Sequence, residues 1–379
     1  MTATAPAPGT VLPEMDVALR LPRLRVALAA LEDAPDALLV TNLKNIRYLT
    51  GFTGSAAMLV LIPDAVLLTT DGRYRTQSAQ QLQAAGVAAR FAIGKPSEQE
   101  EEISLALAAA ACTTVGLEAT HVTWSQQRRL LDVWDGVHEV VPTSGLVECL
   151  RRTKDAGELA RVREAARIAD AALDQVSHLL GEGVTEIEFG IELDFAMRRL
   201  GASGPSFETI VASGPNGAKP HHRPSGRRIE RGELITLDFG ALVDGYCSDM
   251  TRTVCVGFPS DPQYIRMLEV VAESQAAGVA AVRAGVEAST VDRACRAVIE
   301  DAGWGEQFVH GTGHGVGLDI HESPAVSATS CDVLTTGSVV TVEPGVYLPG
   351  IGGVRIEDCV VVTDTGCDPL TRFPKDWIL

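Results

Sequence analysis

The sequence predicts an α/β domain followed by an α+β domain with an internal pseudo-two-fold. A chain of 379 residues is longer than one typical domain and suits two. Short apolar runs alternate with helical patterns in the first part of the chain, and a pattern of helix, helix and hairpin occurs twice in the rest. We therefore expect a disordered lead at 1–15, an α/β domain at 16–150 and a second domain at 151–379.

Strands and helices interleave along the first domain. The apolar segments that we expect as strands are DALLVTN, AAMLVLIP, AVLLTT, FAIG, TVGLEA and EVVP. Helical patterns lie between them at 75–85, 98–111 and 125–134. The stretch NIRYLTGF around Arg47 is expected to be extended. This alternation is typical of α/β domains.

Two capping boxes open the second domain. Asp155 followed by Glu158 predicts the start of a long amphipathic helix, and Thr185 followed by Glu188 predicts a second helix that ends before Gly201. The segments expected as strands after them are FETIVAS, ELITLDFG and YCSDMTRTVCV.

The same order of elements then repeats. Asp261-Pro262 predicts a helix to about Ala284, a second helix is expected at 289–302, and GSVVTVEP and VRIEDCVVVT are expected as strands. Glycines mark the same boundaries in both copies, 102 positions apart: Gly183 and Gly285, then Gly201 and Gly303. Two copies are too few for a solenoid, so we expect a closed domain with an internal two-fold.

The composition argues against two classes of partner. The formal net charge of −17 disfavours nucleic acid and anionic membranes, because binding to a polyanion needs a basic surface. The sequence has no run of about eighteen apolar residues, and its first twenty residues do not resemble a signal peptide. The eight cysteines are scattered without a C-x-x-C pair, which favours reduced thiols in the cytoplasm.

The first predicted hairpin brings two aspartates together. Asp244-Gly245 is a strong signal for a two-residue turn, and that turn places Asp249 opposite Gly240. Asp238, two positions from Gly240, then becomes a diagonal neighbour of Asp249 on the same face. A loop of odd length would instead put the two aspartates on opposite faces.

The second predicted hairpin does the same with two glutamates. If its turn centres on Gly350, Glu343 and Glu357 lie directly opposite each other. Both occur in otherwise apolar strands, so we expect them to point inward.

Four inward carboxylates need cations beside them, because burying ionised carboxylates is costly and neighbouring ones repel each other. Arg252 and Arg355 are one source of positive charge, as ion-paired residues of an ordinary sheet. Divalent metal ions are the other, because one metal binds several oxygens and two metals share bridging carboxylates. His314, in HGTGHGVGLDIHESP at 310–324, offers a nitrogen ligand between glycines. The stretch lacks the spacing and the lysine of a phosphate loop, and HExxH is absent.

These residues resemble a known family. In chain order, the acidic residues and the histidine resemble the dinuclear metal ligands of the M24 metallopeptidases, which have the pita-bread fold: Asp238, Asp249, His314, Glu343 and Glu357. The flanking segments KPHHRPS, LDFGALVDGYCSDMTRT, VEPGVY and GVRIED are similar to the proline-specific branch, Xaa-Pro dipeptidase (prolidase) and Xaa-Pro aminopeptidase. In the first domain, IRYLTGFTGSAA and TTDGRY are similar to the creatinase/prolidase N-terminal domain.

The resemblance implies a role for each ligand. Asp238 would chelate one metal, Asp249 and Glu357 would bridge two, and His314 and Glu343 would complete the separate sites. Glu343 would also accept the proton of the attacking water. The cofactor would be two divalent ions per chain, Mn, Co or Zn.

The resemblance also implies how a substrate is held. His221, His310 and His321 would hold the scissile carbonyl as catalytic and substrate-binding donors. His222 follows His221 along an expected strand and would point to the other face, so we expect it to be structural. A cation would recognise the free carboxylate of a dipeptide, and the candidates are Arg47, Arg73, Arg355 and Arg372.

The implied function is hydrolysis of the Xaa-Pro bond at the N-terminus of short proline-containing peptides by a cytoplasmic homodimer. A dipeptidase is favoured, with an aminopeptidase for longer peptides as the alternative. A creatinase-like hydrolase and a non-enzymatic pita-bread scaffold are further alternatives.

Overall fold

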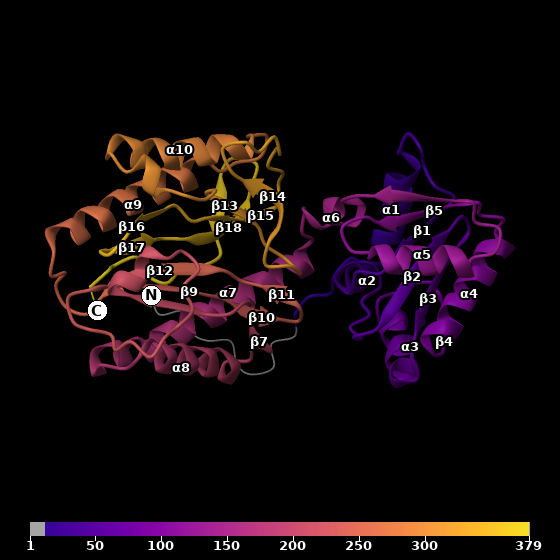
Figure 1. The fold of residues 1–379 in the computed structure, drawn as a ribbon, viewed down its shortest axis with the longest axis horizontal. Helices are drawn as coiled ribbons and strands as arrows, with labels where there is room; N and C mark the ends of the chain where they lie inside the picture. The colour runs from indigo at the N-terminus through magenta and orange to yellow at the C-terminus, as the bar shows by residue number, and fades with distance from the viewer. Residues whose placement is uncertain (1–11, 379) are drawn as a thin grey trace. The chain divides into compact units, whose positions relative to one another are not determined.

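The computed structural model describes residues 12–378 and divides the chain into two compact units. One unit comprises 14–151, and the other comprises 152–378 together with Leu12 and Pro13 (Figure 1). Most of the predicted disordered lead, 1–11, lies outside the described residues, and 12–15 belong to no helix or strand. No helix within the described range is long and apolar enough to cross a membrane.

A six-stranded mixed sheet forms the centre of the N-terminal unit, in the order β4-β3-β2-β1-β5-β6. All six strands agree with predicted segments: β1 (Ala37–Val40), β2 (Ala57–Ile62), β3 (Ala65–Thr70), β4 (Arg90–Ile93), β5 (Thr114–Glu118) and β6 (Glu139–Thr143). The first three strands pair antiparallel, and the outer pairs are parallel. Parallel pairs need crossover connections, which explains the helices between them.

The helices of this unit are α1 (Arg20–Ala29), α2 (Leu43–Thr50), α3 (Arg75–Ala84), α4 (Pro96–Ala109), α5 (Trp124–Val133) and α6 (Leu146–Arg151). The short 3₁₀ turns of the whole chain are η1 (Val17–Leu19), η2 (Gly72–Tyr74), η3 (Ser177–Glu182), η4 (Gly214–Ala218) and η5 (Gly305–Gln307). The three helical patterns predicted here correspond to α3, α4 and α5.

The expectation of an extended segment around Arg47 is wrong, because this residue lies on α2. The side chain of Asn42 caps the first turn, and Gly51 ends the helix with a φ of 74°. Ile46 and Leu49, three positions apart, are fully buried on one helix face. A cap at each end and this spacing favour a helix over a strand.

Four long helices belong to the C-terminal unit: α7 (Ala156–Val176), α8 (Glu186–Arg199), α9 (Pro262–Ala281) and α10 (Ala288–Asp301). Both predicted capping boxes are present, at the starts of α7 and α8. The first and last residues of α8 and α10 differ by 102 positions, as the glycine spacing predicts. In Figure 1, α9 and α10 lie on one side of the strands, and α7 and α8 lie on the other.

The strands between these helices form four small sheets. The strands of the first half are β7 (Gly204–Pro205), β8 (Ile210–Ser213), β9 (Leu234–Phe239), β10 (Ala241–Val243), β11 (Tyr246–Cys247) and β12 (Met250–Cys255). Those of the second half are β13 (Gly313–Gly315), β14 (Glu322–Val326), β15 (Val339–Val342), β16 (Gly345–Leu348), β17 (Gly352–Arg355), β18 (Asp358–Val362) and β19 (Cys367–Pro369). Each half has its own apolar core, beneath α7 and α8 or beneath α9 and α10.

Both predicted hairpin registers are confirmed. Thr251 pairs with Asp238 across β12 and β9, and this register places Asp249 opposite Gly240. In the second half, β15 pairs with β18 and β16 pairs with β17 in one continuous register, so Glu343 lies opposite Glu357 between the two ladders. The two carboxylate pairs therefore lie where their hairpins change from one sheet to another.

Candidate metal centre

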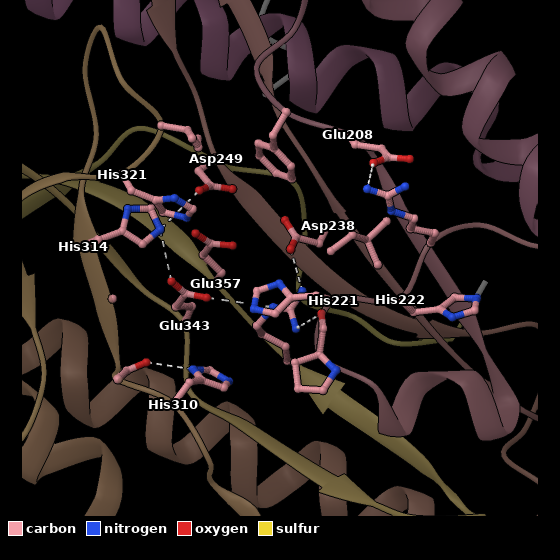
Figure 2. Close-up of a pocket in the computed structure, with 18 residues that line it drawn as sticks. Glu208, His221, His222, Asp238, Asp249, His310, His314, His321, Glu343 and Glu357 are labelled. Atoms are coloured by element: carbon pink, nitrogen blue, oxygen red, sulfur yellow. Dashed lines mark hydrogen bonds and ion pairs between the residues drawn. The ribbon is translucent and has the colours of Figure 1, made fainter. Parts of the chain in front are cut away.

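Three carboxylates converge at the centre of the C-terminal unit. Asp238, Asp249 and Glu357 each offer an oxygen atom, and these three atoms lie within 4.8 Å of one another. Asp249 is 5% exposed and Glu357 is 1% exposed. They line a cavity of about 470 Å³ together with Glu343 and five histidines of the C-terminal unit (Figure 2). The predicted ligand residues are thus brought together around one cavity.

His314 completes the cluster on β13. Its Nε2 atom lies 3.3 Å from Oε1 of Glu343 and 3.6 Å from Oδ2 of Asp249. Its Nδ1 atom lies 3.0 Å from the carbonyl oxygen of Gly315, so Nδ1–H donates to the backbone and Nε2 faces the carboxylates. This is the arrangement that metal-ligating histidines usually adopt.

Glycine is required beside His314. A Cβ atom on Gly313 would lie 2.1 Å from the carbonyl oxygen of Thr341, because β13 runs close to β15 there. The hydroxyl of Thr341 also accepts the backbone N–H of His314 at 3.0 Å. The glycines of this stretch therefore allow the close backbone approach that places the imidazole.

The carboxylates are held in a strongly unfavourable environment for negative charge. Burial and then the neighbouring carboxylates raise the pKa of Asp249 and of Glu357 well above their ordinary values. Burial also raises the pKa of Asp238, although the nearby Arg355 opposes this. Protein groups alone do not neutralise the cluster, so cations in the cavity would stabilise its ionised form.

The hydrogen bonds of these carboxylates fit metal ligation. Oδ2 of Asp238 accepts from Arg355 at 2.5 Å, and Oε2 of Glu357 accepts from the hydroxyl of Thr251 at 2.7 Å. Their other oxygens, Oδ1 and Oε1, are buried and have no hydrogen-bond partner within residues 12–378. A buried polar atom without a partner costs free energy, and carboxylate oxygens are good ligands for hard divalent ions. The donor set present therefore fits a metal.

Arg355 lines the cavity beside the cluster, but protein acceptors occupy its guanidinium. Its guanidinium donates to Asp238, to the hydroxyl of Tyr347 at 2.8 Å, to Thr251 at 3.1 Å and to the carbonyl of Pro220 at 3.3 Å. It is therefore a partner of a ligand carboxylate, one of the two roles that the sequence suggests. The sequence reasoning missed Tyr347, although the tyrosine occurs in the segment VEPGVY.

The predicted histidines differ in their hydrogen bonding. Both ring nitrogens of His310 have partners, the carbonyl of Gly311 at 2.8 Å and the hydroxyl of Tyr347 at 2.9 Å. His221 and His321 line the cavity. Burial lowers the pKa of His310 and of His321, which favours neutral rings.

Two further predicted residues lie away from the cluster. His222 contacts Glu186 at 2.9 Å, which agrees with the structural role predicted for it. Arg47 belongs to the other unit, on α2, and its role in substrate binding stays a prediction.

The sequence model of metallopeptidase family M24 matches residues 160–364 of the chain. The chain belongs to metallopeptidase family M24. It is therefore a hydrolase, and family membership implies use of divalent metal. The creatinase/prolidase N-terminal domain matches residues 20–153, so the M24 domain is preceded by an α/β domain of that type.

Solved structures agree with this M24 assignment. The chain is similar to an Xaa-Pro dipeptidase from Bacillus anthracis, with a TM-score of 0.91 and 40% identity over 96% of this chain and 100% of that one. It is also similar to an X-Pro aminopeptidase from Thermotoga maritima, with a TM-score of 0.83 and 34% identity over 91% and 98%. The predicted pita-bread fold is confirmed.

The chain is also similar in sequence to an Xaa-Pro dipeptidase from Pyrococcus furiosus. The two are 39% identical over 263 residues, which are 69% of this chain and 75% of the relative.

Proposed function

We propose that the chain is a dinuclear-metal exopeptidase that hydrolyses the Xaa-Pro bond at the N-terminus of short peptides. The observation that carries the proposal is the pair of buried oxygens on Asp238 and Glu357 that have no hydrogen-bond partner among the described residues, within a cluster that also contains Asp249. The names of the relatives, Xaa-Pro dipeptidase and X-Pro aminopeptidase, support the substrate class.

Five side chains would hold two divalent ions, Mn, Co or Zn: Asp238, Asp249, His314, Glu343 and Glu357. When bound, such ions would neutralise the carboxylates, activate water and polarise the scissile carbonyl. An ion-paired sheet without metal would instead give both orphaned oxygens a protein donor.

Glu343 and three cavity histidines would act on the attacking water and on the substrate. Glu343, which already contacts Nε2 of His314, would accept the proton of the attacking water. His221 and His321 would donate hydrogen bonds to the carbonyl oxygen as charge develops on it. The ring of His310 would contact the substrate, and the hydroxyl of Tyr347 would fix the orientation of that ring.

A dipeptidase is the favoured form of this activity. The Xaa-Pro dipeptidase of known structure is 40% identical to this chain, and the X-Pro aminopeptidase is 34% identical. Because protein acceptors occupy the guanidinium of Arg355, the cation for a substrate carboxylate would come from another residue. We further propose a cytoplasmic homodimer.

Hydrolysis of matched peptides tests this function. Mn²⁺-loaded protein should cleave Ala-Pro, should cleave Ala-Pro-Gly-Gly more slowly, and should leave Ala-Gly intact. A chelator should abolish cleavage and added Mn²⁺ should restore it. Strong preference for the tetrapeptide would favour the aminopeptidase, and cleavage of neither proline peptide would overturn the proposal. A creatinase-like hydrolase would hydrolyse creatine in the presence of chelator, and a scaffold would hydrolyse nothing.

A further inference from the structure

A buried carboxylate outside the cavity gathers an unusual number of donors. Glu186 is the first residue of α8, and its side chain is fully buried. Within the described residues, its partners all come from one later segment of the chain: the backbone N–H and hydroxyl of Ser213, Nδ2 of Asn216, Nε2 of His222, and the backbone N–H and hydroxyl of Ser225, at 2.6–3.2 Å. The side chain of Glu186 therefore holds the segment 213–225 in place through hydrogen bonds.

This segment carries groups of the cavity but has little structure of its own. Apart from the short 3₁₀ turn η4, it forms no helix or strand after β8. It bears His221, which lines the cavity, and Pro220, whose carbonyl accepts from Arg355. Regular secondary structure does not fix its path, so the hydrogen bonds to Glu186 have a large part in doing so.

His221 and its neighbour His222 show how this anchoring reaches the cavity. Nε2 of His222 lies 2.9 Å from Oε2 of Glu186, while the adjacent His221 lies among the labelled cavity residues (Figure 2). The two residues are adjacent in a turn in which the backbone N–H of His222 donates to the carbonyl oxygen of Lys219 at 3.1 Å, so a shift of His222 moves the backbone that carries His221. Displacement of His222 would therefore rotate His221 away from its place in the cavity.

Glu186 is unsuited to proton transfer. Burial alone would raise its pKa, but hydrogen bonds from Ser225, Ser213, Asn216 and His222 lower the pKa to about 2. It therefore stays ionised over the working range of an enzyme, and its lone pairs are already occupied. An anchoring function fits these properties, whereas a general base does not.

The other half of the C-terminal unit contains a comparable arrangement. Asp292 on α10 is fully buried and accepts from the backbone N–H and hydroxyl of Thr312 at 3.1 and 2.9 Å. It also pairs with Arg296, which donates to the carbonyl of His310 at 2.9 Å. In each half, a buried carboxylate on the second helix holds the segment that carries a cavity histidine.

We propose that Glu186 is a positioning residue that sets the orientation of His221 toward the substrate. The proposal rests on the proposed function, because it assigns His221 a contact with the scissile carbonyl. It predicts that Glu186 affects catalysis through His221 and leaves metal binding unchanged, since Glu186 contacts none of the five candidate ligands in any hydrogen bond that the described residues show.

A double-mutant cycle tests the coupling. Glu186→Gln should lower kcat/KM for Ala-Pro by about 10- to 100-fold, because small misplacements of catalytic groups cost that much. In a His221→Ala background, the same substitution should change kcat/KM by less than about twofold, since its target is gone. Equal losses in both backgrounds would show that Glu186 does not act through His221 and would overturn the proposal.

Two further variants guard against general damage to the fold. Glu192→Gln removes an exposed carboxylate from the same helix and should leave kcat/KM unchanged. Ser225→Ala removes the 2.6 Å hydroxyl contact with Glu186 and the 3.2 Å contact that this hydroxyl accepts from the backbone N–H of Arg227. It should give a smaller loss than Glu186→Gln, because the other donors to Glu186 remain, so it serves if that variant folds poorly. A loss in Glu192→Gln equal to that in Glu186→Gln would contradict the proposal.

Amide hydrogen exchange gives a readout that needs no activity. In metal-loaded protein, Glu186→Gln should speed exchange at 213–225 at least about tenfold, with bound metal per chain unchanged. Unchanged exchange in that segment would overturn the inference, whether or not the wild-type protein cleaves Ala-Pro. Absence of cleavage by the wild-type protein would instead count against the proposed function.

Discussion

Nη2 of Arg355 lies 2.5 Å from Oδ2 of Asp238, and both side chains are largely buried. The second oxygen of this aspartate, Oδ1, has no hydrogen-bond partner among the residues that the structure describes. The ion pair therefore occupies only one oxygen of the Asp238 carboxylate. The other oxygen is left for the cluster around Asp249 and Glu357. Arg355 thus stabilises the site without filling it.

Removal of this guanidinium should destabilise the metal-free protein. In Arg355→Met the carboxylate of Asp238 stays buried without its cation, and such losses cost about 3–5 kcal/mol of unfolding free energy. Urea unfolding in the presence of chelator measures it. Arg372→Met changes an exposed arginine of the same unit and should shift the unfolding free energy by less than about 0.5 kcal/mol. If the unfolding free energy fell by the same small amount in both variants, Arg355 would not be the partner that stabilises the buried Asp238.

The hydroxyl of Tyr347 should matter for catalysis more than for metal binding. It lies 2.9 Å from Nε2 of His310 and 2.8 Å from Nη1 of Arg355. Tyr347→Phe should lower kcat/KM for Ala-Pro by about 10- to 100-fold, as losses of such supporting partners commonly do. Tyr264→Phe is the matched control, because that hydroxyl contacts only the carbonyl of Ile351 at 3.3 Å in the part described. Wild-type kinetics in Tyr347→Phe would contradict this role.

The sequence was sufficient to predict the hairpins and their carboxylates, because these depend on local rules. The two-residue turn at Asp244-Gly245 determines which residues are opposed, and the period of two along a strand determines their faces. The placement of Asp238, Asp249 and Glu357 in one cluster follows from those rules once two inner hairpins pack together.

Partners that are distant in the chain could not be predicted in this way. Glu186 meets donors that are 27 to 39 positions further along, and no periodicity records that contact. The link from Tyr347 to His310 spans 37 positions and likewise exists only in the folded unit. In contrast, the sequence does contain the information needed to predict α2, because Asn42 and Gly51 are recognisable helix caps.

Gly240 should tolerate no side chain. A Cβ atom there would lie 1.9 Å from the carbonyl oxygen of Ser248 and 2.3 Å from the hydroxyl of Ser206. Gly240→Ala should therefore lose at least about 2 kcal/mol of unfolding free energy and weaken metal binding, because Asp249 directly follows the displaced Ser248. Gly181→Ala, where a Cβ meets nothing within 4 Å, is the control. Equal stability of the two alanine variants in urea would show that the strands can separate at no cost.

Asp170 should give the protein a pH-dependent stability between about pH 4 and pH 6. Burial raises its pKa to about 6 from 3.8, although the backbone N–H groups of Phe373 and Arg372 partly oppose this. The folded state thus holds this proton more tightly than the unfolded state. The stability that it contributes is complete below about pH 4 and is lost as the pH rises through 6, by at most about 3 kcal/mol.

Asp170→Asn removes this titration. The difference in unfolding free energy between wild type and variant, measured in urea from pH 4 to pH 7, should therefore fall as the pH rises. A difference that stays constant over this range would show that Asp170 titrates normally.

The metal content of the protein tests the central claim most directly. Wild-type protein loaded with Mn²⁺, desalted and assayed for bound metal should retain about two equivalents per chain, because two ions suit four carboxylates and one imidazole. The loaded protein should cleave Ala-Pro, and the chelated protein should not. Wild-type protein that retained no metal and still cleaved Ala-Pro would contradict the account.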